Sequence, residues 1–265
     1  MLRALLRTLL IGGLALATSS CPARFEAPGR TAAGAGPQEG RALGAPLGSS
    51  RDRVPAPPMS YLGADWLTRP ERIEEEQPDK MLDALGIRPG MMVADIGAGV
   101  GYHAFRMADR VGPEGRVYAT DIQEEMLSLL KKSTRERGIK NVVPILSGEA
   151  STGLPAASVD LVLMVDVYHE LSEPERFLSA LKVALKPGAR VALVEFRGED
   201  SSVPIREEHK MTAAQVVREL SAAGFQLVER HDFLPWQHIL IFAAARSCDP
   251  SGSSKTSAAC LGSTR

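Results

Sequence analysis

The sequence predicts an α/β domain in which a mostly parallel sheet carries helices on both faces. Three observations support this prediction. A short apolar run, Met91 to Ile96, leads into three glycines and then into a helical pattern. A second run, Asp160 to Val167, is almost continuously apolar, as expected of a central parallel strand that is buried on both faces. Strand and helix patterns alternate along most of the remaining chain, which is typical of a parallel sheet with crossover helices.

Seven strands are expected, with helices between most of them. The strand patterns cover residues 91–96, 116–120, 141–146, 160–167, 191–196, 225–229 and 239–244. The segment from Leu185 to Gly188 is expected to be a turn, because it contains Pro and Gly. The last two strands form a hairpin, so the last strand is antiparallel. The helix expected over residues 122–137 buries a face made of Met126, Leu127, Leu129 and Leu130.

Length and charge limit the classes of function. The chain has 265 residues, enough for one α/β domain with extensions, and its formal net charge is −1. A charge balance this close to zero gives no argument for nucleic-acid binding. The expected partner is a small molecule, and the sequence does not indicate an oligomeric state.

Residues 1–20 are expected to be a signal peptide. Arg3 and Arg7 give a positive start, and Leu9 to Ala17 is an apolar run too short to span a bilayer. Small residues then lead to Cys21, which resembles the cleavage site of a bacterial lipoprotein. This resemblance implies a lipidated Cys21 and a place in the cell envelope, with the membrane contacted through that lipid only. An ordinary secretory signal and an uncleaved anchor are the alternatives.

Residues 21–58 are expected to be a disordered tether, because they are rich in Gly, Pro, Ala, Arg and Ser and almost lack aromatic residues. The folded domain is expected over residues 59–245, followed by a disordered tail over residues 246–265. Translation from Met59 is an alternative, and it would give a cytoplasmic protein without the leader.

The segment from Tyr61 to Gln77 begins with bulky side chains, among them Trp66 and Leu67, and continues with charged ones. Two interpretations stay open for this segment. One is a small lid helix over a ligand cleft, and the other is a solvated helix whose apolar side packs on the core.

The glycine turn gives the clearest indication of function. Gly97, Gly99 and Gly101 follow the first strand directly, and a helix begins next to them. Glycine lets the backbone approach a ligand closely, and a helix start offers free N–H groups. Asp95 lies at the strand end, where a carboxylate would repel a pyrophosphate. It would suit a ligand that carries an ammonium group and no phosphate, which describes S-adenosylmethionine.

The spacing D-x-G-x-G-x-G from Asp95 to Gly101 closely resembles motif I of the class I S-adenosylmethionine-dependent methyltransferases. Gly148-Glu149 and the segment from Leu185 to Gly188 resemble the quinone-biosynthesis group of that family. The resemblance implies a seven-stranded, Rossmann-like, doubly wound sheet with S-adenosylmethionine as cofactor. The residues that it implies for cofactor binding are Asp95, Gly97, Gly99, Gly101, Asp121, Ile122, Gly148, Glu149 and Asp166.

Two of these acids have specific expected roles. Asp121 ends the second strand about twenty residues after the glycines, where a carboxylate accepts hydrogen bonds from ribose hydroxyls. The alternative for Asp121 is a cap on the helix that follows. In the resembling group, the acid at Glu149 faces the adenine amino group.

The acceptor side is expected at the carboxyl ends of the fourth and fifth strands. His169 follows the fourth strand, Glu195 and Arg197 end the fifth, and His209 lies in a later loop. Histidine is a suitable proton acceptor near neutral pH, so His169 and His209 are the candidate catalytic residues. No metal ion is expected. A metal site built from His169, Glu195, His209 and His238 has suitable ligand types, but no close-spaced ligand pair supports it.

The sequence therefore predicts a methyltransferase that acts on a small-molecule or lipid-like acceptor. The alternative is an exported, non-catalytic binding module that retains the fold. The leader keeps this alternative open, because S-adenosylmethionine is made and used in the cytosol.

Overall fold

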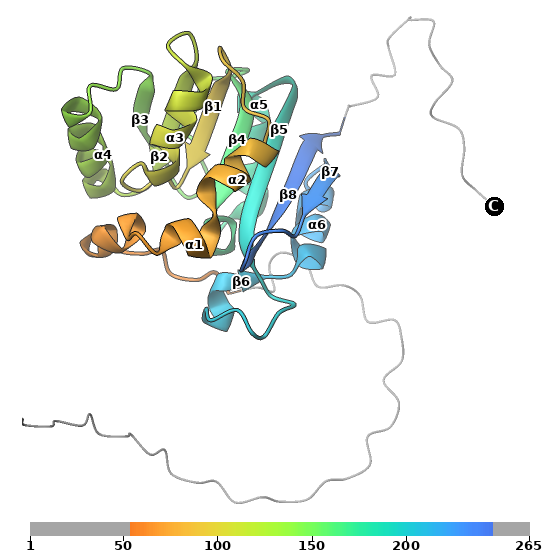
Figure 1. Ribbon diagram of the computed structural model, residues 1–265. Coiled ribbons are helices and arrows are strands. Elements are labelled where there is room, and N and C mark those ends of the chain that lie inside the picture. Colours follow the sequence, from red (N-terminus) through yellow and green to blue (C-terminus); the bar gives the residue numbers. More distant parts are fainter. Residues whose placement is uncertain (1–53, 246–265) are drawn as a thin grey trace, which may run out of the picture. The chain divides into compact units, whose positions relative to one another are not determined.

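The computed structural model describes residues 54–245, which form a sheet with helices on both faces (Figure 1). The expected signal peptide, Cys21 and the expected tail lie outside these residues. Among residues 54–245, no helix is long and apolar enough to cross a lipid bilayer.

The sheet has eight strands in the part of the chain that the structure describes. They are β1 (Met92–Ile96), β2 (Arg116–Asp121), β3 (Val142–Leu146), β4 (Val159–Val165), β5 (Leu185–Arg197), β6 (Lys210–Met211), β7 (Phe225–His231) and β8 (Gln237–Ala244). Their order across the sheet is β3-β2-β1-β4-β5-β8-β7, and β6 pairs with the carboxyl end of β5. All seven expected strands are present, and β6 is the short addition that the sequence did not indicate.

Helices surround the sheet and precede it. They are η2 (Tyr61–Thr68), α1 (Arg72–Glu76), α2 (Pro78–Ala84), α3 (Tyr102–Val111), α4 (Glu124–Glu136), η3 (Tyr168–Glu170), α5 (Pro174–Ala184), η4 (Glu207–His209) and α6 (Ala213–Ala222). Local sequence explains several of their starts. Pro78 stands in the first turn of α2, and the Thr212 hydroxyl caps α6 by accepting from the Gln215 N–H at 3.1 Å.

Strand pairing confirms the predicted fold class. β1 pairs in parallel with β2 and β4, and β4 pairs in parallel with β5. β8 runs antiparallel to both β5 and β7. Because the parallel strands all end at one edge, the loops that follow them gather on the same side of the sheet. η2 and α1 lie along this edge in Figure 1.

The core has two layers, one on each face of the sheet. Successive side chains of a strand point to opposite faces. Leu161 and Leu163 of β4 pack with α2, α3 and α4, whereas Val162 and Met164 pack with α5 and α6. All four side chains are fully buried, which explains why the sequence of β4 is almost continuously apolar.

Two details predicted from the sequence are wrong. Leu129 is 37% exposed, because it lies on the side of α4 that lines a shallow surface depression with Tyr61. The expected turn from Leu185 to Gly188 is the start of β5, where Leu185 pairs with Val159 ahead of a register shift. The Pro and Gly therefore mark an irregularity inside the strand rather than a turn before it.

The fold begins before Met59. Ala56, which the sequence assigned to the tether, is buried and donates a backbone hydrogen bond to the His169 carbonyl at 3.2 Å. Pro55, Pro57 and Pro58 line the main cavity of the domain. A chain that started at Met59 would lack this part of the cavity wall.

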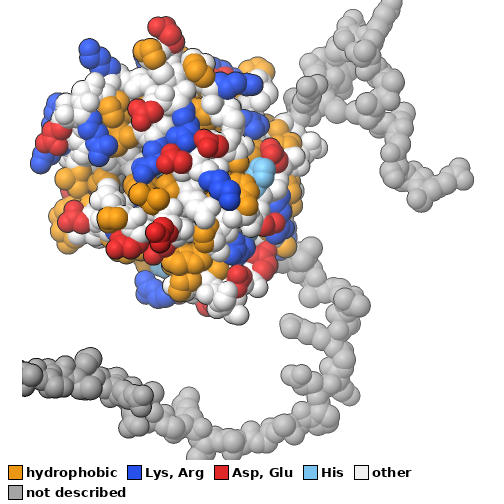
Figure 2. Space-filling model, viewed as in Figure 1, with side chains coloured by type: hydrophobic (Ala, Val, Ile, Leu, Met, Phe, Trp, Pro, Cys, Tyr) orange, Lys and Arg blue, Asp and Glu red, His pale blue; other side chains and the backbone are white. Residues whose placement is uncertain are grey.

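The surface carries both signs of charge. Figure 2 shows Lys and Arg side chains interspersed with Asp and Glu on the face in view, with hydrophobic side chains between them. This mixed surface agrees with the formal net charge of −1. No field of a single sign covers that face.

Candidate active site

The glycine turn after β1 is shaped by close contacts. Gly97 has a φ of 68°, and a Cβ there would lie 2.5 Å from a methyl group of Val167. A Cβ on Gly99 would lie 2.9 Å from Leu67 of η2. Gly97 and Gly99 line the main cavity. Gly101, with a φ of 95°, is the N-cap of α3 and does not line the cavity, because it packs against Leu130.

Asp95 lies behind the glycine turn. Its side chain is buried and accepts a hydrogen bond from the Ala104 N–H at the start of α3. Its Oδ2 has no hydrogen-bond partner among the described residues. Burial raises the pKa of the Asp95 carboxyl to about 7. Asp95 therefore carries its negative charge only above about pH 7; it lies behind the glycine turn and is not part of the cavity lining.

Asp121 connects the ends of β1 and β2. Its Oδ2 accepts from the Gly99 N–H at 2.9 Å, and its Oδ1 accepts from the Gln123 N–H at 2.9 Å. The N-cap of α4 is Gln123, so the alternative that Asp121 caps this helix is wrong. Each carboxylate oxygen has a second lone pair, and Asp121 lines the cavity. The geometry is therefore compatible with ribose binding.

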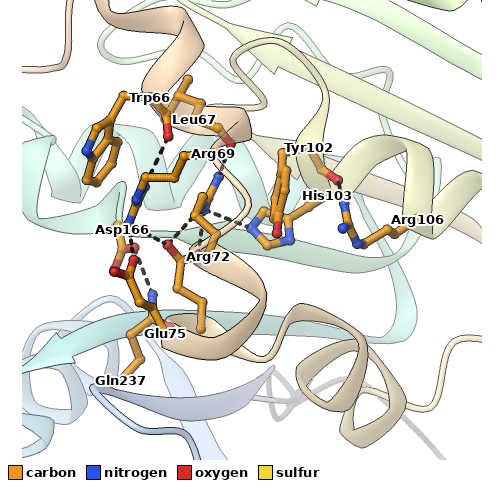
Figure 3. A network of polar contacts seen from close by, with 11 residues as sticks. Trp66, Leu67, Arg69, Arg72, Glu75, Tyr102, His103, Arg106, Asp166 and Gln237 are labelled. Carbon is orange, nitrogen blue, oxygen red and sulfur yellow. Dashed lines mark hydrogen bonds and ion pairs between the residues drawn. The ribbon is translucent and has the colours of Figure 1, made fainter. Parts of the chain in front are cut away.

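Arg72 of α1 holds the segment from Tyr61 to Gln77 over the start of α3 (Figure 3). Its guanidinium donates to Glu76 at 2.7 and 2.6 Å and to the Leu67 carbonyl at 2.6 Å. The same group lies 4.1 Å from the centre of the Tyr102 ring. Trp66, Leu67, Arg72 and Glu76 also line the main cavity. The segment is therefore a lid over the cleft, and the alternative of a helix that only packs on the core is wrong.

The main cavity has a volume of about 870 Å³ and opens at the carboxyl ends of the parallel strands. This is a usual size and place for a small-molecule site in an open α/β sheet. Most of the predicted site residues line it, from loops that are far apart in the sequence. These residues are Gly97, Gly99, Asp121, Ile122, Gly148, Glu149, Asp166, His169 and His209.

The two candidate catalytic histidines are in contact. His169 Nδ1 lies 2.7 Å from a carboxylate oxygen of Glu195, and His169 Nε2 lies 3.1 Å from His209 Nδ1. Burial alone would lower the pKa of His169, but the charge of Glu195 and its hydrogen bond raise it above its usual value. Burial and the neighbouring His169 lower the pKa of His209. Glu195, His169 and His209 thus form a chain that ends in the cavity.

Asp166 is held in an unusual backbone conformation at the end of β4. Its φ is 53°, which non-glycine residues seldom adopt. Gln237 of β8 donates to its Oδ2 at 2.8 Å, while its Oδ1 has no partner among the described residues. Burial and the charges of Glu76 and Glu195 raise the pKa of Asp166 well above its ordinary value. Asp166 lines the cavity, as do the lid residues and both histidines.

Glu170 follows β4 beside His169, at the strand end where the sequence places acceptor-side groups. It lines the cavity, and burial raises the pKa of its carboxyl to about 7. Gln237 was missed by the sequence interpretation, because its contact with Asp166 spans 71 residues of sequence.

Two residues expected on the acceptor side lie elsewhere. The Arg197 guanidinium binds the backbone carbonyls of Leu234, Pro235 and Gln237, so the expectation that it faces the cavity is wrong. His238 is fully buried on β8, and neither of its ring nitrogens has a partner among the described residues. It does not line the cavity, so the metal site that included His238 is also wrong.

The comparison with known families decides the identity of the fold. A family described as "Methyltransferase domain" matches residues 87–239, which is more than half of the chain. The chain belongs to this family. Together with the sheet order, the match identifies a class I S-adenosylmethionine-dependent methyltransferase, with S-adenosylmethionine as the family's cofactor.

A solved relative covers most of the domain. It is an S-adenosylmethionine-dependent methyltransferase from Aquifex aeolicus with 31% identity and a TM-score of 0.67, and the match covers 70% of this chain and 98% of that one. The described residues fit the cofactor. Gly97 and Gly99 form a turn with no room for a Cβ, and an unpartnered carboxylate oxygen of Asp95 lies beneath it.

Two curated relatives carry different names. A protein-L-isoaspartate O-methyltransferase from Methanothrix thermoacetophila is 33% identical over 114 residues, which are 43% of this chain and 51% of that protein. A ubiquinone/menaquinone biosynthesis C-methyltransferase from Cupriavidus taiwanensis is 33% identical over 111 residues, which are 42% and 45%. The chain thus spans about half the length of these relatives, whose names refer to unlike acceptors.

Proposed function

We propose that this methyltransferase transfers a methyl group from S-adenosylmethionine to a small-molecule or lipid-like acceptor bound in the main cavity. One observation carries the proposal: a single cavity is lined by the glycine turn, by Asp121 and by the two contacting histidines. When bound, the cofactor supplies an electrophilic methyl group. The protein then has to hold the acceptor in line with that methyl group and receive a proton where the acceptor carries one.

The cofactor side is assigned by the chemistry of the lining groups. Gly97 and Gly99 leave room for the ligand, and Asp95 provides negative charge for its ammonium group. Asp121 accepts from the ribose hydroxyls beside Ile122. Glu149, which follows Gly148, accepts from the adenine amino group, and its carboxylate already accepts from the Ser172 hydroxyl at 2.8 Å. Asp166 completes the wall between the cofactor and acceptor sides.

Asp121→Ala is expected to weaken S-adenosylmethionine binding at least about tenfold, which is 1.4 kcal/mol, because it removes charge-assisted hydrogen bonds to ribose. Titration calorimetry with S-adenosylmethionine measures this directly. Asp109→Ala, on the exposed side of α3, is the matched control and should bind normally. Unchanged affinity in Asp121→Ala would remove the ribose assignment, and tighter binding of NAD than of S-adenosylmethionine would contradict the proposed cofactor site.

The acceptor side is assigned to His169 and His209, with His169 as the proton acceptor. Glu195 holds one ring nitrogen of His169, which directs the other nitrogen toward His209 and the cavity. A buried carboxylate in this position also stabilises the imidazolium that forms when His169 takes a proton. His209 is the more exposed of the two residues, and both line the cavity.

We further propose that Cys21 is the lipidated N-terminus of the mature protein in the cell envelope. The support is the positively charged start, the apolar run and the small residues before Cys21. Several acyl chains anchor a protein stably, whereas one gives marginal attachment. Cys21→Ser is expected to move the protein from the membrane fraction to the soluble fraction, as measured by cell fractionation. Mass spectrometry of the native protein should find no peptide upstream of Cys21, and an N-terminus at Met1 or Met59 would refute the proposal.

The second candidate function is an exported binding module without catalysis, which the leader favours because the cofactor is made in the cytosol. Calorimetry separates the two candidates. Binding of S-adenosylmethionine in the micromolar range, followed by product formation in a screen of phenols, quinones, thiols and carboxylates, supports the enzyme. A purified chain that binds no cofactor supports the module.

A further inference from the structure

Three side chains at the acceptor end of the cavity are close enough to share one ion. His169, Glu170 and His209 each offer a ligand atom, and these atoms all lie within 4.8 Å of one another. All three residues line the cavity. Two imidazole nitrogens and one carboxylate oxygen are a common donor set for Zn²⁺ in sites that keep a further position open.

The neighbourhood of His169 resembles that of a metal ligand. Its Nδ1 faces the Glu195 carboxylate at 2.7 Å, and the other oxygen of Glu195 accepts from the Tyr168 N–H at 2.8 Å. Glu195 is fully buried, so the orientation of the His169 ring is fixed. Ligating histidines usually donate their second nitrogen to a carboxylate or carbonyl in this way. The lone pair on Nε2 is thereby directed toward His209.

The spacing of the two rings fits a tetrahedral ion. His169 Nε2 and His209 Nδ1 are 3.1 Å apart. Two nitrogens bound to one Zn²⁺ at the usual bond length are about 3.3 Å apart, so the rings need to separate only slightly. An N–H···N hydrogen bond between the rings is the other way to fill this gap.

The Glu195 carboxylate lies 2.7 Å from His169, and its negative charge favours a cation at the site. The opposing cation is Arg206, whose guanidinium lies 3.5 Å from Nε2 of His209. That nitrogen is not the one that faces His169, so Arg206 does not occupy the space between the rings.

We propose that His169, Glu170 and His209 form a binding site for a divalent transition-metal ion, in the first place Zn²⁺, with a fourth position open to the cavity. Glu195 is a positioning residue of this site. A bound ion uses the lone pair on Nε2 of His169, which accepts a proton in the metal-free protein. His169 therefore acts either as a metal ligand or as the proton acceptor, but not as both at once. The metal site itself does not depend on the proposed function. The proposed function is needed only for the statement that the open position faces a methyl acceptor.

The test uses the full chain, freed of metal by chelator, in a background with Cys21, Cys248 and Cys260 changed to Ser. Those substitutions remove competing thiolate ligands. Calorimetry with ZnCl₂ is expected to show one ion per chain, and CoCl₂ is expected to give the visible absorption of tetrahedral Co²⁺. His209→Ala and Glu170→Gln should weaken Zn²⁺ binding at least about tenfold, and Glu195→Gln by about 10–100-fold. His231→Gln, on β7, is the matched control and should bind normally.

Absence of Zn²⁺ binding would overturn the proposal, and so would binding that persists unchanged in both His209→Ala and Glu170→Gln. Circular dichroism identifies any variant that fails to fold, and Glu170→Gln keeps the size of the side chain if His209→Ala does fail. Titration of the same samples with S-adenosylmethionine separates this inference from the proposed function. Cofactor binding without Zn²⁺ binding rejects the metal site alone, whereas Zn²⁺ binding without cofactor binding rejects the cofactor assignment alone.

Discussion

Asp95→Asn is expected to make the free methyltransferase more stable at pH 8 while weakening its affinity for S-adenosylmethionine. The reason is that burial raises the pKa of the Asp95 carboxyl to about 7, whereas the same group titrates near 3.8 when unburied. A shift of this size corresponds to at most about 4 kcal/mol. The asparagine keeps the shape of the side chain, so it removes the cost of the buried charge without creating a cavity.

The sign of the pH dependence follows from where the proton is held. Between about pH 4 and pH 7 the unfolded chain has lost the Asp95 proton and the folded chain has kept it. This group therefore lowers the free energy of unfolding as pH rises through that range, and its effect is constant above pH 7. Urea titrations from pH 4 to pH 8 should show the difference between Asp95→Asn and wild type growing toward pH 7.

The loss of cofactor affinity has the opposite cause. The ammonium group of S-adenosylmethionine is attracted to the ionised carboxylate, so wild-type affinity should rise as pH increases through about 7. Asp95→Asn should bind about tenfold more weakly at pH 8 and lose that pH dependence. Asp109→Asn, on the exposed side of α3, controls for the change in net charge. Identical pH profiles of stability in Asp95→Asn and wild type would show that Asp95 is not held protonated.

The cofactor side could be predicted from the sequence because its elements are local. Asp95 and the three glycines lie within seven consecutive residues, and a sheet that places β1 between β2 and β4 brings their turn to the ligand edge. The sequence could not separate Gly101 from the other two glycines. All three have positive φ, but only the packing of Leu130 shows that Gly101 serves the start of α3.

The acceptor side was only partly predictable, because its contacts join distant residues. His169 meets Glu195 across 26 residues and His209 across 40. The sequence placed all three at strand ends or in loops on one side of the sheet. The rule that ligands bind at the carboxyl ends of parallel strands predicts this side, but it does not predict which side chains touch. Glu195 was expected to face the cavity, but it supports His169 from behind. Which of two neighbouring polar residues points into a cavity depends on packing. Arg197 is a second example, because its guanidinium binds backbone carbonyls instead of facing the cavity.

The lid illustrates a second limit. The pattern of Trp66 and Leu67 was equally compatible with a lid and with a helix on the core. The structure favours the lid because of Arg72. Its hydrogen bonds to Glu76 and to the Leu67 carbonyl hold the segment against Tyr102. An Arg and a Glu four residues apart are also common on solvent-exposed helices, so the spacing of Arg72 and Glu76 does not show that both are buried.

Glu195→Gln is expected to lower methyl transfer by about 10²–10⁴-fold while leaving S-adenosylmethionine affinity near that of wild type. The glutamine carbonyl can still accept from the Tyr168 N–H, which places its amide group against His169 Nδ1. An amide N–H donates there, so the ring must carry its proton on Nε2 instead. His169 then has no lone pair toward His209 and the cavity, and neither proton transfer nor metal binding can use it.

Two measurements separate this positioning role from a loss of structure. Turnover is measured as S-adenosylhomocysteine formation with an acceptor identified by screening, and His169→Ala should show a loss of similar size. Nitrogen NMR of the His169 ring reports the tautomer directly and needs no acceptor. Gln215→Ala, which removes the amide donor to the buried Glu219 of α6, is a control for disturbing a buried carboxylate outside the cavity. Full turnover in Glu195→Gln, or an unchanged tautomer of His169, would show that Glu195 does not set the state of the acceptor-side histidine.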